Sequence, residues 1–371
     1  MAEPLKNIYS TAFVDLVADS LEEITTSFDR TSFITEVFDT HWEKKELKER
    51  TSHMAVIVRG RLDENFKKCV DQLIMMIEYY QKVGYQELMY ASLGFIFIPE
   101  IIEKYGLDDF PTSIQAFPKI TPFTSCEFAV RPFIIKNQQK MLEVAFEWSK
   151  HENEHVRRLS SEGTRPRLPW GVAFPALKKD PLPLMAILEN LKNDSSEYVR
   201  RSVANNLNDI SKDHPQFMID IANKWMGETI ETDALIKHAC RTLLKEGRCE
   251  VLQLFGYASP KTFEIKDFTI LSPKVKFGGA LDFQFEIINT SSKLEKVRIE
   301  YGLYFLKKNG THSKKVFKIS EGEYKGKKTR IIQRQQSFRR ITTRTYYAGI
   351  HQVSLIINGQ ESEKLSFELC D

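Results

Sequence analysis

A polar stripe in the segment 197–213 ends in a carboxylate among basic and amide side chains. If this segment is a helix, its apolar residues from Val199 to Ile210 share one face. Carboxylates add nothing to a surface that only binds a polyanion, because they repel phosphates. A fixed carboxylate instead stabilises positive charge or activates water, so this stripe favours catalysis. The stripe consists of Arg201, Asn205, Asn208 and Asp209.

Two further residues could take part in chemistry, and each also has a plainer explanation. Glu127 follows Thr124 and Ser125, which can cap a helix, and an acid in a first helical turn is favoured by the helix dipole alone. Trp170 could be an ordinary core residue. It lies, however, in the irregular, arginine-bearing insertion GTRPRLPWGVAF, where prolines stiffen the chain and its ring could meet a ligand.

The stripe belongs to a helix pattern that recurs at intervals of about 40 residues. Shifted back by 43 residues, Arg158 takes the position of Arg201 and Glu162 that of Asn205, and a weaker copy places His238 there. Helices that repeat at this interval are typical of stacked HEAT or armadillo hairpins, whose outward rows form one surface. The sequence therefore predicts that these polar residues face outward along one side of an α-solenoid.

Residues 1–258 have a helical period throughout, and we predict that they form one helical-repeat domain. Helices are expected over 138–148 and 154–162. The apolar run 88–98 is expected to be a buried helix that closes at Pro99, too short to span a membrane. The segment 110–125, rich in proline and threonine, is expected to be a loop.

From residue 259 the apolar period changes from 3.6 to 2. Alternating residues run through 281–287, 297–305, 351–357 and 365–369, and the pairs Asn309-Gly310 and Asn358-Gly359 are hairpin turn signals. Short strands of this kind predict an immunoglobulin-like β-sandwich over 259–371. It lacks the usual cysteine pair, because Cys370 is its only cysteine. The predicted fold class is thus mainly α, an α-solenoid followed by a C-terminal sandwich.

Charge is distributed unevenly along the chain. The segment 307–344 holds 13 Lys or Arg against Glu321 and Glu323, a net +11, so the remainder carries −8 of the total +3. A basic run is often only a solvated face. Interleaved aromatic and glutamine residues favour contact with nucleic acid or phosphate. The expected DNA-binding residues in this run are Lys327, Lys328, Arg330, Arg339 and Arg340.

Other features exclude several classes of protein. The N-terminus lacks the basic and apolar regions of a secretory signal, and no run is long enough to cross a membrane. The five cysteines are scattered and have no metal-ligand spacing, which favours a reducing cytoplasm. We expect no metal and no cofactor. Nothing in the sequence requires more than a monomer.

Three segments resemble one family closely: CEFAVRPF, EGTRPRLPW and VRRSVANNLNDISKDHP. They are similar to the bacterial DNA alkylation repair glycosylases with HEAT-like repeats, in the AlkC branch, and the resemblance extends over essentially the whole chain. It implies removal of 3-methyladenine and 3-methylcytosine from duplex DNA without base flipping, in a bacterial cytoplasm at the nucleoid. The catalytic positions that it implies are Glu127, Trp170 and Asp209.

The resemblance also implies a surface that holds DNA. The basic residues Arg158, Arg165, Arg167 and Arg201 would contact the phosphate backbone, with Glu162 and Asn205 on the same surface. Two other functions remain open. The chain could be a non-enzymatic scaffold for nucleic acid or protein, as many helical-repeat proteins are. A lyase or nuclease would use a lysine nucleophile or a cluster of metal-binding acids, and the sequence identifies neither.

Overall fold

The structure, a computed structural model, describes residues 4–85, 91–339 and 344–370. The chain divides into two compact units. The first comprises residues 1–213 and 227–239, and the second comprises residues 214–226 and 240–371. Each unit is described by itself. Whether residue 258 is the end of the helical domain stays a prediction.

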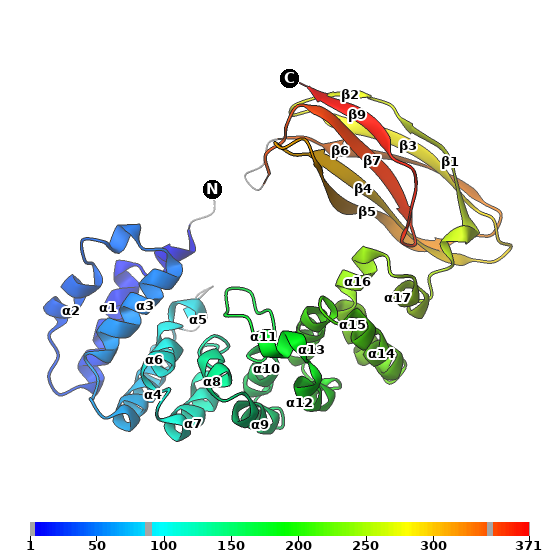
Figure 1. Cartoon of the computed structure of the whole chain (residues 1–371). Helices are drawn as coiled ribbons and strands as arrows, with labels where there is room; N and C mark the ends of the chain where they lie inside the picture. Colours follow the sequence, from blue (N-terminus) through cyan, green and yellow to red (C-terminus); the bar gives the residue numbers. More distant parts are fainter. Residues whose placement is uncertain (1–3, 86–90, 340–343, 371) are drawn as a thin grey trace. The chain divides into compact units, whose positions relative to one another are not determined.

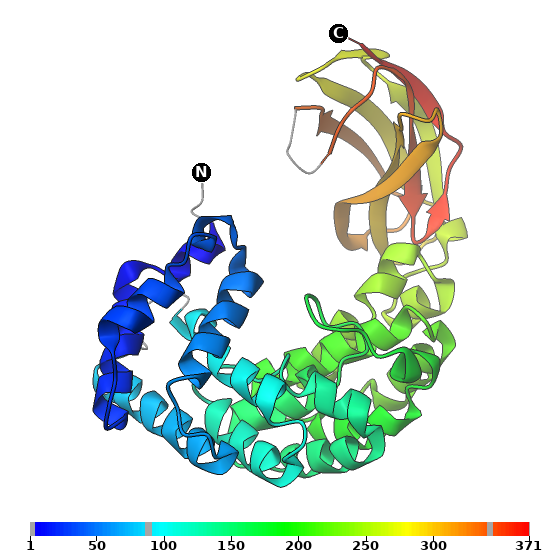
Figure 2. The ribbon, with the colours of Figure 1, turned by 60° about the vertical axis from the view of Figure 1, so that its left-hand side comes forward.

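The first unit consists of helices that follow one another in chain order as a curved row (Figures 1 and 2). The helical period of the sequence is confirmed, and buried residues such as Val17, Leu73, Val156 and Leu207 lie on the predicted faces. The helices are α1 (Thr11–Ile24), α2 (Arg30–Val37), α3 (Leu47–Arg59), α4 (Phe66–Lys82), α5 (Ala91–Gly94), α6 (Phe97–Tyr105), α7 (Phe110–Ile120), α8 (Arg131–Lys136), α9 (Gln138–Trp148), α10 (Glu154–Glu162), α11 (Pro175–Lys179), α12 (Met185–Leu191), α13 (Glu197–Ser211) and α15 (Ile230–Ala239).

The predicted loop at 110–125 is wrong for most of its length, because residues 110–120 form α7. Asp109 caps this helix, its carboxylate accepting from the Thr112 amide at 3.2 Å. Pro111 lies in the first turn, where no amide donor is needed. Pro118 lies inside the helix and removes one backbone hydrogen bond. The cap and the buried face, which includes Phe117, outweigh that loss.

The predicted helix 88–98 is also wrong. Residues 88–90 lie outside the described residues, and the chain forms the short α5 and then the separate α6. Pro99 does not end a helix, since it lies in the first turn of α6 and is buried. A proline fits there because the first amides of a helix have no partner within it.

Helices α10 and α13 pack side by side, as the 43-residue repeat predicts. The hydroxyls of Ser161 and Ser202 are 2.7 Å apart, and the Asn206 amide donates to the Ser161 carbonyl at 2.8 Å. These buried polar contacts fix the register between the two helices, because an unpaired polar group would be costly there.

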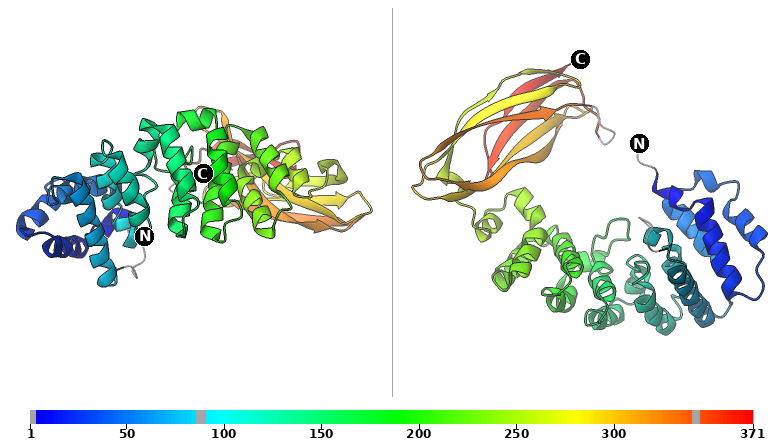
Figure 3. Two further views of the ribbon diagram at one scale, coloured as in Figure 1. Left: turned by 90° about the horizontal axis from the view of Figure 1, so that it is seen from below. Right: turned by 180° about the vertical axis from the view of Figure 1, so that it is seen from behind.

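The second unit contains the predicted sandwich together with α14 (Pro215–Trp225), α16 (Arg241–Glu246) and α17 (Cys249–Leu254). Figure 3 shows its two sheets as separate layers. One sheet has the order β1-β3-β6 and the other β2-β9-β7-β4-β5, with β8 beside β7. The strands are β1 (Phe263–Ile270), β2 (Lys274–Lys276), β3 (Ala280–Asn289), β4 (Glu295–Leu306), β5 (His312–Tyr324), β6 (Thr329–Ser337), β7 (Gly349–Ile357), β8 (Gln360–Glu361) and β9 (Leu365–Cys370).

The alternating residues of the sequence form the core between these sheets. Phe283 and Phe285 from β3 meet Tyr301 and Leu303 from β4, and all four are buried. Both predicted hairpin turns are present. At the second, Asn358 and Gly359 have φ of 44° and 84°, the left-handed conformation that such turns require. Within the described ranges, no helix is both long enough and apolar enough to cross a membrane.

Candidate active site

Five charged side chains of the first unit form one continuous network of ion pairs, which we call the carboxylate–arginine row. Arg158 Nη1 lies 2.7 Å from Glu127 Oε2, and Arg158 Nη2 lies 3.7 Å from Glu162 Oε1. Arg165 continues the row, with Nη1 at 2.6 Å from Glu162 Oε1 and Nε at 2.9 Å from Asp209 Oδ2. Two residues predicted to be catalytic, Glu127 and Asp209, are thus joined by three predicted to bind DNA.

The row is built from four segments. Glu127 lies in the turn before α8, Arg158 and Glu162 lie on α10, Arg165 lies on the following loop and Asp209 lies on α13. The expectation that Glu127 occupies the first turn of a helix is wrong, since α8 begins at Arg131. The side chain of Glu127 is held instead by Ser125, whose Oγ donates to Oε2 at 2.9 Å.

Most of the row is less exposed than the repeat pattern predicts. The side chain of Asp209 is 1% exposed, and Glu162, Arg165 and Asn208 are buried as well. The outward positions that the repeat pattern predicts are therefore wrong for Glu162, Asn208 and Asp209. Arg165, which the family resemblance and not the repeat assigns to the DNA-contacting surface, is buried as well. For Glu162 and Asp209 the reason is the loop 163–174, which places Arg165 against their carboxylates. A helical wheel carries no information about such a covering loop.

Burial and neighbouring charges have opposite effects on the pKa values of Arg158 and Arg165. Burial alone would lower the pKa of Arg158, but the carboxylates of Glu127 and Glu162 raise it above its ordinary value. Arg165 behaves in the same way beside Asp209 and Glu162, and its pKa is also raised. Both guanidinium groups are therefore cations at any physiological pH.

The three carboxylates differ in how many of their oxygens are engaged. Asp209 accepts from Arg165 at one oxygen and from Lys212 at the other, 2.9 Å away. Glu162 accepts from Arg165 at Oε1 and from Ser202 at Oε2, 2.6 Å away. Glu127 receives both of its bonds at Oε2, and no residue that the structure describes bonds to its Oε1. Glu127 is therefore the carboxylate with an oxygen available to a ligand.

Trp170 lies at the tip of the loop 163–174 and is 62% exposed. Its φ of 64° is in the left-handed region, which is costly for a bulky residue and persists only where the surroundings impose it. Lys48 on α3 helps to hold Trp170 in this backbone conformation, because its amine donates to the Trp170 carbonyl. The interpretation of Trp170 as a core residue is wrong, and its ring is accessible.

Arg131 holds the same loop from its inner side. Its Nε donates to the Val172 carbonyl at 2.7 Å, and its Nη1 donates to the Gly163 and Arg165 carbonyls at 3.0 and 3.1 Å. The guanidinium also stacks on the Phe174 ring at 3.7 Å. Burial, with the nearby charge of Arg165, lowers the pKa of Arg131 to about 10. The loop conformation depends on this buried cation.

Several residues of the site were not singled out from the sequence. Lys48 and Arg131 precede Trp170 by 122 and 39 residues, and nothing near them in the sequence indicates their partners. Ser125 was considered only as a helix cap. Tyr198, 42% exposed, lies with its ring 4.8 Å from the Arg158 guanidinium. Its position three residues before Arg201 on the outward face is a signal that could have identified it.

The other residues predicted to bind DNA in the first unit lie beside the row. Arg167 pairs with Asp213 at 2.6 Å and is partly exposed. Arg201 is exposed on α13 and lines a shallow cavity with His238. The Asn205 Oδ1 atom lies 3.2 Å from His238 Nε2, within hydrogen-bond distance. Of the four predicted arginines, Arg201 is the most accessible to a phosphate.

The predicted basic residues of the second unit follow strand β6. Lys327 and Lys328 lie in the turn before it, Arg330 lies on it and Arg339 follows its end, and all are exposed. Arg340 lies outside the described residues. Arg330 stacks over the Tyr324 ring at 4.2 Å. In the described part of the sheet, β6 pairs only with β3, so these cations lie along a sheet edge.

A metal would need a different set of side chains. In the part of the chain that the structure describes, no three His, Cys, Asp or Glu side chains are grouped so that they could hold an ion. Among the described residues, the carboxylate oxygens of the row other than Glu127 Oε1 accept from arginine, serine or lysine donors.

Two family models match this chain, one over its helical part and one over its immunoglobulin-like sandwich. Residues 107–243 match the family described as DNA alkylation repair enzyme, and residues 264–371 match the C-terminal Ig-like domain of the uncharacterised protein YhaZ. The chain is 40% identical over 366 residues to YhaZ of Bacillus subtilis (strain 168), with 99% of each chain covered.

One solved structure is similar over the whole chain. It is the alkylpurine DNA glycosylase AlkC of Pseudomonas fluorescens, bound to DNA that contains an abasic site analog. The TM-score is 0.90 and the identity is 31%, with 99% of both chains covered. The protein therefore belongs to the DNA alkylation repair enzymes of the AlkC type, and the family resemblance drawn from its sequence is confirmed.

Proposed function

We propose that this protein is a DNA glycosylase that hydrolyses the N-glycosidic bond of alkylated bases in duplex DNA. The observation that carries the proposal is the open oxygen of Glu127, in a row of fixed carboxylates in the same unit as an exposed, rigidly held tryptophan. The substrates we expect are cationic lesions, 3-methyladenine and 3-methylcytosine. A base alkylated at a ring nitrogen carries a positive charge, so it departs as a neutral molecule and needs little acid catalysis.

The demanding step is then at the sugar. As the C1′–N bond breaks, its electron pair leaves with the base and C1′ becomes positively charged. We assign Glu127 to stabilise this charge through Oε1 and to accept a proton from the attacking water, whose oxygen bonds to C1′. A neutral adenine or guanine lacks the charged leaving group, so the same carboxylate would accelerate its loss little. No metal and no cofactor take part in this scheme.

Asp209 and Glu162 have a supporting role in this proposal. Both oxygens of each accept hydrogen bonds. One oxygen of each carboxylate accepts from Arg165, and the other accepts from Ser202 in Glu162 and from Lys212 in Asp209. They hold Arg165, and Glu162 also approaches Arg158, which orients Glu127. We therefore assign Asp209 to position the row and to contribute negative potential, rather than to contact the sugar.

Trp170 would present its ring to the lesion and the adjacent deoxyribose. The attraction between a cation and a shielded indole face is on the order of 1–2 kcal/mol. Its exposed position on a fixed loop suits contact with a base that stays in the duplex, so the proposal does not require base flipping.

Lys48→Met is expected to lower the single-turnover excision rate by about tenfold, because a small misplacement of a positioned group can cost that much or more. The Trp170 carbonyl would lose its lysine donor, and the tryptophan could leave its strained conformation. The measurement is 3-methyladenine release from methylated duplex. Lys44→Met, which changes another exposed lysine near α3, serves as the control and should match the wild type.

Duplex DNA is the proposed partner, held by exposed cations such as Arg201 and those along β6. Replacing Lys328, Arg330 and Arg339 together by glutamine is expected to weaken DNA binding and to lower the salt-dependence slope by about 2–3, roughly 0.9 for each phosphate contact. Binding should be measured at several salt concentrations. A matched triple change of Lys266, Lys274 and Lys293, also exposed on the sandwich, should leave the slope unchanged.

Substitution is a sharper test of the sandwich than removal of residues 260–371. The Asn358 amide donates to the Ala258 carbonyl at 2.7 Å, and Gly247 lies against Gly359. Deleting residues 260–371 would therefore also remove residues that the segment containing α16 and α17 packs against. We still expect the fragment 1–258 to bind DNA much more weakly. If it folds and keeps full affinity, the sandwich has no part in DNA binding.

The proposed function is tested by base release from duplex DNA treated with a methylating agent, with a chelator present. Release of 3-methyladenine by the wild-type protein is the expected result. Tight, salt-sensitive binding without release would instead identify a non-enzymatic scaffold, the main alternative. A requirement for Mg²⁺ would indicate another chemistry. DNA as the substrate places the protein in the cytoplasm, where its five unpaired cysteines stay reduced.

A further inference from the structure

Arg158 is the cation that holds Glu127, the residue to which we assign the chemical step. Its Nη1 donates to Glu127 Oε2 at 2.7 Å and to the Ser125 hydroxyl at 3.2 Å. Its Nη2 lies 3.7 Å from Glu162 Oε1, which is an ion-pair contact without a hydrogen bond. The donors of a guanidinium group lie in its plane, so its position depends also on what covers its faces.

The ring of Tyr198 covers one of these faces. The guanidinium carbon of Arg158 lies over this ring, 4.8 Å from its centroid. The same ring meets the His155 ring edge-on, with the centroids 5.6 Å apart. Tyr198 is in the first turn of α13, whereas His155 and Arg158 are one turn apart on α10. The ring therefore spans one turn of the neighbouring helix and fixes the direction from which Arg158 approaches Glu127.

The contact between Tyr198 and Arg158 depends on the ring of the tyrosine. Its side chain is 42% exposed and that of Arg158 is 16% exposed, so the ring shields the guanidinium group from water. Shielding of this kind strengthens the attraction between a cation and an aromatic face. Burial raises the pKa of Tyr198, although the charge of Arg158 opposes this shift, so the phenol stays neutral at physiological pH. No hydrogen bond to its hydroxyl occurs within the described ranges.

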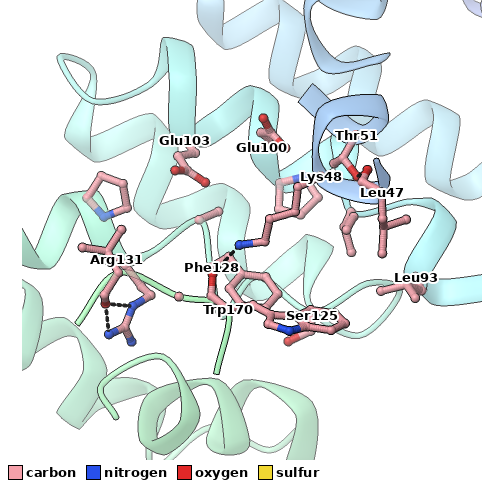
Figure 4. A pocket seen from close by; sticks show the side chains of 16 residues that line it. Leu47, Lys48, Thr51, Leu93, Glu100, Glu103, Ser125, Phe128, Arg131 and Trp170 are labelled. Atoms are coloured by element: carbon pink, nitrogen blue, oxygen red, sulfur yellow. Dashed lines mark hydrogen bonds between the residues drawn. The ribbon is translucent and has the colours of Figure 1, made fainter. Parts of the chain in front are cut away.

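The position of Arg158 affects two parts of the site. Glu127 Oε2 accepts from both Arg158 and Ser125, and these two bonds set the direction of the open Oε1 atom. Ser125 also lines a cavity of about 250 Å³ together with Trp170 (Figure 4). A movement of Arg158 would therefore disturb the carboxylate of Glu127 and also the wall of the cavity to which Trp170 belongs.

We propose that Tyr198 is a positioning residue for base excision, whose ring holds Arg158 in place so that Arg158 orients Glu127. This inference rests on the proposed function, because it gives Tyr198 a part in the same reaction. The role belongs to the aromatic face. A tyrosine that contacts a DNA phosphate would instead use its hydroxyl as the donor, so the two roles respond differently to removal of the hydroxyl.

The test is single-turnover release of 3-methyladenine from methylated duplex by the full-length protein. The protein is kept at saturating concentration, so that weaker DNA binding cannot lower the rate. Tyr198→Phe keeps the ring and should stay within about twofold of the wild-type rate. Tyr198→Leu keeps an apolar side chain without the ring, and its rate should fall about tenfold, because a small misplacement of a positioned group can cost that much. Equal losses in both variants, or no loss in Tyr198→Leu, would overturn the proposal.

The matched control is Tyr105→Leu. Tyr105 is also 42% exposed, and the guanidinium carbon of Arg59 lies 5.5 Å from the centroid of its ring. Arg59 donates to backbone carbonyls of residues 62–64 and is not a member of the carboxylate–arginine row. Tyr105→Leu should therefore release base at the wild-type rate. A tenfold loss in this control would show that removal of any such ring lowers activity, which would overturn a specific role for Tyr198.

A double-mutant cycle tests whether Tyr198 acts through Arg158. In an Arg158→Met background, the further change Tyr198→Leu should alter the excision rate by less than about twofold. A further tenfold loss there would show that Tyr198 acts by another route. Arg158→Met removes the cationic partner of Glu127, so its folding is checked by circular dichroism. If this variant does not fold, the comparison of Tyr198→Phe with Tyr198→Leu decides the question alone.

A measurement without DNA separates this inference from the proposed function. Hydrogen exchange of the Arg158 Nε proton, followed by NMR, should be at least threefold faster in Tyr198→Leu than in the wild type, because the ring no longer shields the guanidinium group. Tyr198→Phe should exchange like the wild type. The same exchange rate in all three proteins would refute the hold on Arg158. If the wild type releases no base, the glycosylase assignment fails, whereas the exchange rates still decide whether Tyr198 holds Arg158.

Discussion

Glu127→Gln is expected to lower the rate of 3-methyladenine release by about 10²–10⁴-fold, the range over which one positioned acid–base group contributes. The amide has nearly the same shape, so Ser125 can still donate to its oxygen. It carries no charge to stabilise the sugar cation, and it cannot accept a proton from water. Single-turnover release from a methylated duplex measures the effect on the chemical step.

The same variant should bind DNA as tightly as the wild type or slightly more tightly, because it removes a negative charge from a surface that faces phosphates. Glu152→Gln, at an exposed glutamate of the same unit, is the matched control and should retain full activity. Release by Glu127→Gln within about threefold of the wild-type rate would show that another group acts on the sugar.

Asp209→Asn is expected to lower both activity and stability. The free energy of unfolding should fall by about 2–3 kcal/mol, because a buried arginine would lose one of its two charged partners. Arg165 would still meet Glu162, which limits the loss. Base release should fall by about 100-fold, since Asp209 supplies both negative potential and the alignment of the row.

The two variants are distinguished by measuring denaturant unfolding beside base release. Glu127 is 16% exposed, whereas Asp209 is 1% exposed, so only the aspartate change should be strongly destabilising. If Asp209→Asn keeps wild-type stability and loses activity as completely as Glu127→Gln, Asp209 contacts the substrate itself. In that case its role as a positioning residue is incorrect.

The sequence was sufficient to predict the helices and strands whose buried apolar residues recur at a regular spacing. The 3.6-residue period gave α10 and α13 and their side-by-side packing, and the period of two gave β3, β4 and β7. These predictions succeed because each buried face repeats within a few neighbouring residues. The resemblance to AlkC-type enzymes was likewise carried by three short segments, and the comparisons confirm it.

What the sequence could not predict depends on distant contacts. The burial of Glu162 and Asp209 follows from the loop 163–174, and that loop is fixed by Arg131 and Lys48 from other helices. The helix α7 was missed because proline was weighed without the Asp109 cap. Trp170 was suspected of meeting a ligand only because its neighbours were irregular and basic. The structure shows that its side chain is exposed, and its contact with DNA stays a prediction.

Positive and negative charges nearly cancel in the carboxylate–arginine row. Its three carboxylates are matched by Arg158 and Arg165 together with Lys212, so the free protein presents almost no net charge there. An approaching duplex is therefore not repelled. If a DNA phosphate draws Arg158 away from Glu127, we expect that carboxylate to be left uncompensated and the negative potential there to grow. In the proposed function, the site would then attract a cationic base most strongly only after DNA has bound.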